Sequence, residues 1–241
     1  QAVRLDPNSP VAHYNKGRAL YDLNRRQEAR AELATASRLQ PDYAPALYLL
    51  AHVTKQLGDA QKSTELLERL VKLTPDDADA QSLLGQNLLR LGKTDEAIEH
   101  LRLAVQANPK SSEALYSLAQ TLAKAGKPEA KEYAARFNDL EQERQLTDRV
   151  QQLGNFGLEA ANARNWPQAI EDLNEALEIC GDCRFSADLH RNLGLIYCRK
   201  GEVENGKREL EVALKLRPDD SDARQALDVL ASLPVKPVTA R

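Results

Sequence analysis

The residues with the clearest chemical capacity are two cysteines, Cys180 and Cys183, separated by Gly and Asp. Such a pair can form a local disulfide, act as a redox couple or supply half of a metal site. Zinc needs about four ligands, and the nearby candidates His190 and Cys198 lie roughly 12 Å apart along a helix. A redox role lacks its usual thioredoxin-like strand. A local disulfide or two free thiols is therefore favoured, and a disulfide would indicate an oxidising compartment, periplasmic or extracellular.

The histidines form no catalytic group, because none lies one helical turn from another. No serine stands in a nucleophile elbow, and no glycine loop is suited to phosphate. Acidic pairs such as Asp76-Asp77 and Asp219-Asp220 follow prolines, where they are expected to cap the next helix. We therefore expect no enzyme, no cofactor and no metal site. The four histidines are His13, His52, His100 and His190.

The composition indicates a helical protein. Hydrophobic residues make up 42% of the chain, aromatic residues 5% and charged residues 29%, and strong helix formers dominate. The net charge is −3 with both signs mixed, so the electrostatic footprint of a nucleic-acid binder is absent. No apolar stretch reaches the ~18 residues of a transmembrane helix.

A repeat positions these residues. Prolines recur 34 residues apart, and glycines recur at the same step between them. Apolar residues at helical spacing lie on both sides of Gly92, which predicts one helix before this glycine and a second that ends at Pro109. One such hairpin cannot bury its apolar face alone, so neighbouring hairpins must stack. The recurring residues are Pro7, Pro41, Pro75 and Pro109, and Gly58, Gly92 and Gly126.

The motif Leu83-Leu84-Gly85, Gly92, Glu96-Ala97-Ile98 and Ala104 to Pro109 resembles the tetratricopeptide repeat family. The resemblance covers nearly the whole chain, and its overall style is similar to free-standing bacterial repeat proteins. It implies an all-α fold, a right-handed α-solenoid of helix-turn-helix repeats. Where the family often has Trp, this chain has His13, Leu47, Gln81, Leu115, Leu153 and His190. Six repeats are expected to start near Pro10, Ala44, Ala78, Ser112, Val150 and Ala187.

Irregular spacing after Gly126 divides the expected organisation. Residues 1–127 are predicted to form an N-terminal array, a partial repeat followed by about four repeats, the last one irregular. Residues 128–149 are predicted as an extended helix that links the halves, either separate from the first helix of the next repeat or merged with it. A rigid spacer is favoured over the alternatives, a hinge or a partner-binding ridge. Two further repeats follow over 150–220, and residues 221–241 form a terminal capping helix and a proline-containing tail.

The resemblance implies a non-enzymatic scaffold that binds a partner peptide or protein in a concave groove lined by the first helices. Carried over position by position, the groove comprises Tyr14, Arg18, Tyr21, Tyr48, His52, Lys55, Ser82, Gln86, Arg90, Tyr116, Gln120 and Lys124, with Arg191 and Arg199 in the second half. The family's clamp for heat-shock chaperone tails needs Lys, Asn and Arg at set positions. Tyr14, Leu49 and Asp79 are among the residues found there instead, so such tails are not the expected partner.

The two ends suggest an alternative function. The chain begins inside a repeat and ends with the equivalent of a first helix, so copies are expected to stack head to tail into an oligomer or filament, unless upstream residues cap the first face. The expected contact joins Ala2, Val3 and Leu5 of one copy to Ala223, Leu227 and Leu230 of another. A lesser alternative is an envelope redox or metal-carrying protein that uses the cysteine pair.

Overall fold

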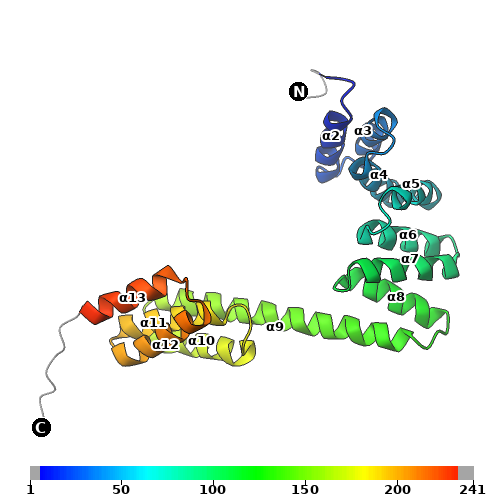
Figure 1. Ribbon diagram of the computed structural model, residues 1–241. Coiled ribbons are helices and arrows are strands. Elements are labelled where there is room, and N and C mark those ends of the chain that lie inside the picture. The colour runs from blue at the N-terminus through cyan, green and yellow to red at the C-terminus, as the bar shows by residue number, and fades with distance from the viewer. Residues whose placement is uncertain (1–5, 233–241) are drawn as a thin grey trace, which may run out of the picture. The chain divides into compact units, whose positions relative to one another are not determined.

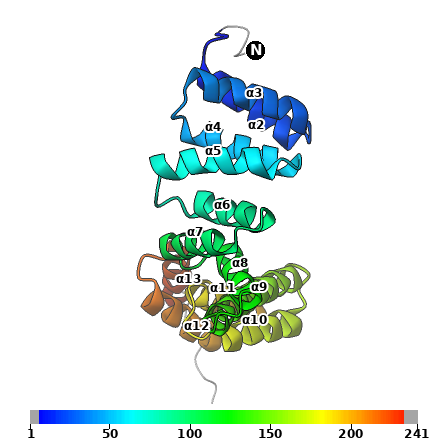
Figure 2. The ribbon, with the colours of Figure 1, turned by 90° about the vertical axis from the view of Figure 1, so that its right-hand side faces the viewer.

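The computed structural model describes residues 6–232, which form twelve α-helices and no strand (Figure 1). In the first part of the chain, helices pair as hairpins, and Figure 2 shows the pairs α2/α3, α4/α5 and α6/α7 stacked one on the next. The helices are α2 (Pro10–Asp22), α3 (Arg26–Leu39), α4 (Ala44–Gln56), α5 (Ala60–Leu73), α6 (Ala78–Arg90), α7 (Thr94–Ala107), α8 (Ser112–Lys124), α9 (Ala130–Asn162), α10 (Trp166–Cys180), α11 (Ser186–Lys200), α12 (Val203–Leu216) and α13 (Ser221–Ser232).

The chain divides into two compact units between Glu141 and Gln142. The first contains α2 to α8 and the beginning of α9, and the second contains the rest of α9 and α10 to α13. Helix α9 has 33 residues and continues past the segment 128–149 that was predicted as a linking helix. Its second part forms the first helix of the repeat expected to start near Val150, because the sequence before Gly154 contains no residue that stops a helix.

Side-chain caps set several of the helix starts. Asp77 Oδ1 accepts a hydrogen bond from Ala80 N at 3.0 Å, and Asp220 Oδ1 accepts one from Ala223 N at 3.0 Å. These bonds satisfy backbone donors that have no partner inside the helix. The interpretation of both acidic pairs as helix caps is therefore confirmed.

The turn inside each hairpin requires a residue with positive φ. Glycine supplies it at Gly58, Gly92 and Gly201, with φ values of 91°, 79° and 95°. Glycine adopts this conformation without a Cβ clash, whereas in other residues the conformation costs free energy. Asn24 and Arg164 hold the same place with φ 59° each, and they are the non-glycine residues with positive φ among residues 6–232.

Small residues let the two helices of a hairpin approach closely. A Cβ on Gly85 would lie 2.6 Å from Cγ of Leu101, and one on Gly17 would lie 2.7 Å from Cγ of Leu33. Both distances are shorter than van der Waals contact, so this row of small residues is a packing requirement of the fold.

Each unit has its own apolar interior. Leu47, Leu67 and Leu84 are among the fully buried residues of the first unit, and Leu173 and Leu193 belong to the core of the second. Tyr133 and Phe137, at the start of α9, pack against the core of α7 and α8. No helix within the described range is both long and apolar enough to cross a membrane. The all-α solenoid expected from the repeat is therefore confirmed.

Candidate functional site

An open hollow of about 510 Å³ lies in the first unit, between the first helices of the first two repeats. Four of the predicted groove residues line it together, and the N-cap of α6 forms one edge. We call it the tyrosine hollow. Its lining consists of Tyr14, Arg18, Tyr21, Asp22, Ala44, Pro45, Tyr48, Leu49 and Asp77.

Aromatic contacts fix the rings around this hollow. Tyr14 meets Tyr43 edge to face, with ring centroids 5.5 Å apart. The Arg18 guanidinium lies 5.9 Å from the centroid of the Tyr14 ring. These contacts hold large amphipathic side chains in place before any ligand arrives, which lowers the entropy lost on binding.

Tyr21, His52 and Gln56 form a polar cluster that joins α2 to α4. Gln56 Nε2 donates to the Tyr21 hydroxyl at 3.1 Å and to His52 Nε2 at 2.9 Å. Burial lowers the pKa of His52, the nearby Lys55 ammonium lowers it further, and the Glu113 carboxylate opposes both. His52 is therefore held neutral near pH 7, with Nε2 as an acceptor.

A second polar chain crosses the first helices of three repeats. Lys55 on α4 donates to the Gln86 side chain on α6, and Gln86 Nε2 donates to Glu113 Oε1 on α8 at 2.6 Å. Burial lowers the pKa of Lys55, Glu113 opposes this shift, and the Arg90 charge adds to it. The structure thus brings the side chains of Lys55, Gln86 and Arg90 near one another.

Tyr48 is half-buried on the same face. Burial raises the pKa of its hydroxyl to about 12, and the carboxylates of Asp79 and Glu113 contribute. From the sequence, Asp79 was named only as a residue that stands at a position of the chaperone-tail clamp, and Glu113 was not named. Their spacing of one repeat could have revealed them, because Asp79 and Glu113 stand 34 residues apart at the same repeat position. The phenol remains protonated and can donate a hydrogen bond.

The last predicted groove residues lie on α8, away from the tyrosine hollow. The Tyr116 ring packs against Phe137 of α9, with centroids 5.3 Å apart. Gln120 donates to the Tyr116 hydroxyl. Lys124 is exposed and forms no hydrogen bond or ion pair with the residues that the structure describes. The projected residues on α8 therefore do not line the tyrosine hollow, and the hydrogen bond from Gln86 to Glu113 connects α6 to α8.

In the second unit, the projected groove arginines have different surroundings. Arg191 pairs with Asp188 at 3.0 Å and with Asp220 at 3.1 Å, which gives it a structural contact between α11 and the start of α13. Arg199 lines a separate hollow at the turn end of the repeats.

Cys180 and Cys183 are joined as a disulfide at the end of α10, with Sγ atoms 2.02 Å apart. Both pack against the core of the second unit, and Cys198 is a free thiol. Among residues 6–232, no three His, Cys, Asp or Glu side chains come together where a metal could bind.

The predicted end-to-end contact is only partly within the structure. Ala2, Val3 and Leu5 lie outside the described residues. Ala223 is completely buried within its own unit, so it is not available to a second copy. Leu227 and Leu230 pack beside it and are half-buried.

Solved structures with a similar arrangement of helices include repeat proteins. One is YrrB, "a TPR protein with an unusual peptide-binding site", at 19% identity over 94% of this chain and 96% of that chain, with a TM-score of 0.47. Another is the Cut9–Hcn1 hetero-tetramer of the APC/C, at 20% identity over 94% of this chain and 44% of that chain, with a TM-score of 0.52. A third is MamA from Desulfovibrio magneticus RS-1, at 18% identity over 88% and 97%, with a TM-score of 0.44.

At such low identity, the likeness to the chain from the Cut9–Hcn1 hetero-tetramer supports the fold alone. No curated protein is similar enough to this chain to count as a relative. The sequence of the repeats is more informative. The model of the tetratricopeptide repeat matches residues 14–78, 48–112 and 82–137, which together span just over half of the chain. This protein belongs to the tetratricopeptide repeat family.

Proposed function

We propose that this protein is a non-enzymatic scaffold that binds an extended segment of a partner protein across the first helices of its first unit. The observation that carries the proposal is the tyrosine hollow, in which Tyr14, Tyr21 and Tyr48 surround about 510 Å³ of open space. Tyrosine combines a large apolar face with a hydroxyl, and it is enriched in residues that dominate binding energies.

The polar groups beside this hollow are suited to backbone recognition. Lys55, Gln86 and Glu113 form a line of donors and acceptors across α4, α6 and α8. An extended peptide exposes its N–H and C=O groups at regular intervals, so side-chain amides along the groove can replace the water bound to them. The apolar side chains of the peptide would occupy the space between the tyrosine rings.

The test is capture of partners from the source cell, followed by affinity measurement. Tyr48→Ala and Tyr116→Ala should each weaken binding by about 1–3 kcal/mol if these rings dominate the interface. Tyr133→Ala is the matched control, because this tyrosine lies at the start of α9 and not on the first helices along which the partner is proposed to bind. Unchanged affinity in a folded Tyr48→Ala, Tyr116→Ala double variant would refute the placement.

Head-to-tail self-assembly is the second candidate. It is favoured by α13, whose Val229 is 55% exposed next to the half-buried Leu227 and Leu230. Light scattering over a range of concentrations tests it. A mass that rises with concentration and returns to that of a monomer in Leu227→Asp would support assembly, and a monomer throughout would reject it.

A further inference from the structure

A second open hollow, of about 600 Å³, lies in the second unit at the turn end of its helices. It is formed by the end of α9, the turn that follows, the start of α10 and the last turn of α11. We call it the arginine hollow. It is lined by Ala161, Asn162, Arg164, Trp166 and Arg199.

The charge of this hollow is uncompensated. Arg164 and Arg199 are both exposed, and neither side chain forms a hydrogen bond or an ion pair within residues 6–232. The described lining contains no Asp or Glu. By contrast, Lys200, next to Arg199, pairs with Glu202 at 2.7 Å. Two guanidinium groups beside one hollow create a positive potential that favours an anion.

The backbone of Arg164 points to a use for its side chain. Its φ is 59°, at the turn position where glycine stands in most of the other repeats. A non-glycine residue in this conformation costs folding free energy, and arginine has no side-chain bond to the local backbone that offsets the cost, as asparagine has. Strained residues of this kind cluster at functional sites.

Trp166 supplies the apolar part of the hollow. It is the only tryptophan of the chain, and it is half-buried against the core of the second unit, which holds the ring in place. Its indole N–H forms no hydrogen bond with the residues that the structure describes. The hollow therefore offers two cationic forks, one free donor and an aromatic surface.

We propose that the arginine hollow binds an acidic peptide segment of a partner protein, with a carboxylate at Arg164 and Arg199 and an adjacent apolar side chain on Trp166. Guanidinium and carboxylate groups match in a planar, two-bond geometry, and Trp and Arg are the residue types that most often dominate protein interfaces. The site shares no residue with the tyrosine hollow. It would give a partner a second point of attachment, one that selects acidic segments over basic ones.

The experiment uses the full chain and the fluorescence of Trp166, which reports this hollow without interference from other tryptophans. The probe is an acetylated, amidated peptide with two glutamates between two leucines. The control peptide has glutamine in place of both glutamates, and inorganic phosphate is a third titrant. Saturable binding of the glutamate peptide, at least about tenfold tighter than of the glutamine peptide, is expected because charged hydrogen bonds are lost in the latter.

Variants separate binding from folding. Arg199→Gln and Arg164→Asn should each weaken the glutamate peptide at least about tenfold, and asparagine is suited to positive φ. Arg164→Gly should remove the same binding while raising the midpoint of thermal unfolding by about 2 °C, because the backbone strain is relieved. Asn24→Gly is the matched control: it occupies the equivalent turn at the same φ, and it should leave the titration unchanged.

The proposal is overturned if the two peptides bind equally, if the arginine variants bind as the wild type does, or if phosphate saturates the fluorescence change and the glutamate peptide produces none. Tyr48→Ala should not alter this titration. A failure of the tyrosine hollow as a binding site would therefore leave this result standing, and the reverse also holds.

Discussion

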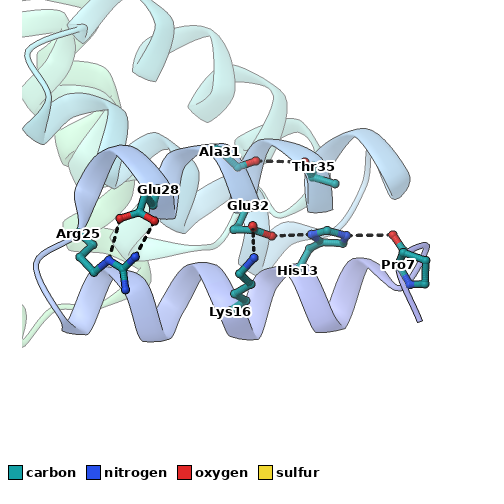
Figure 3. A network of polar contacts seen from close by, with 8 residues as sticks. All are labelled: Pro7, His13, Lys16, Arg25, Glu28, Ala31, Glu32 and Thr35. Carbon is teal, nitrogen blue, oxygen red and sulfur yellow. Dashed lines mark hydrogen bonds and ion pairs between the residues drawn. The ribbon is translucent and has the colours of Figure 1, made fainter. Parts of the chain in front are cut away.

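His13 Nδ1 lies 2.7 Å from Glu32 Oε2, and this pair joins the two helices of the first complete repeat (Figure 3). The other ring nitrogen of His13 lies 3.0 Å from the carbonyl oxygen of Pro7. The same separation of 19 residues recurs in two pairs in other repeats, between side chains at the same positions. They are Gln81 with His100 at 2.7 Å and His190 with Glu209 at 2.6 Å.

Loss of the Glu32 carboxylate should destabilise the first unit. Glu32→Ala leaves Nδ1 of the buried His13 without its partner and the exposed Lys16 ammonium without its ion pair, at a cost of about 1–3 kcal/mol in the free energy of unfolding. Glu28→Ala is the control, because Glu28 is exposed and its ion pair with Arg25 lies at the surface, where such pairs contribute little to stability. Denaturant unfolding of both variants measures the difference, and equal stabilities would contradict a role for the pair.

The same carboxylate makes stability depend on pH. Burial acts to raise the pKa of Glu32, but hydrogen bonds from Lys16 and His13 outweigh it, and the net pKa is lowered from 4.5. A lowered pKa stabilises the fold above that ordinary value, and this stabilisation is lost as the pH falls through the folded value. The wild type should therefore lose more stability than Glu32→Gln between neutral pH and about pH 3.5, and parallel losses would reject the linkage.

The repeat made the helices of the first unit predictable. Four predicted starts coincide with observed ones, Pro10, Ala44, Ala78 and Ser112, because one period of 34 residues fixes all of them. The repeat start expected near Val150 lies within α9. There the sequence lacks a stop signal, so α9 continues through this position.

The site was less predictable, because it depends on side-chain partners from neighbouring repeats. The resemblance placed Tyr14 and Tyr48 on one face, but it did not show that Asp79 and Glu113 face Tyr48. Arginine has no preference for positive φ, so only its place in the repeat, 38 residues after Gly126, could have indicated the unusual backbone of Arg164.

A methyl group at Gly85 should destabilise the third hairpin. Its Cβ would lie 2.6 Å from Leu101 Cγ and 3.1 Å from the carbonyl oxygen of Ala97. The forced shift costs about 1–3 kcal/mol, which exceeds the gain of roughly 1 kcal/mol from alanine's helix propensity. Gly154→Ala, where the nearest atom is 3.4 Å away, is the control and should be neutral or stabilising. Thermal unfolding of both variants measures the difference: the midpoint should fall in Gly85→Ala and should stay the same or rise in Gly154→Ala.

Asp220 has two roles that substitution can separate. It caps α13 through Ala223 N and pairs with Arg191 at 3.1 Å, and its side chain is 3% exposed. Asp220→Asn keeps the capping oxygen and removes the charge, whereas Asp220→Ala removes both. The alanine variant should lose about 1 kcal/mol more, the usual value of an N-cap. Equal losses in chemical denaturation would show that the cap contributes nothing.

The disulfide between Cys180 and Cys183 should stabilise the second unit only modestly. It closes a loop with a sequence separation of three residues, for which the chain-entropy relation gives about 2 kcal/mol at most. Replacing both cysteines with serine should therefore lower stability by no more than this amount, and added reductant should destabilise the wild type but not the variant.

Titration of denatured, non-reduced protein should find a single thiol, that of Cys198. Three titratable thiols in protein purified under oxidising conditions would contradict the bond. The double variant should bind a partner at the tyrosine hollow as the wild type does, because the cysteines lie in the other unit and share no contact with its lining.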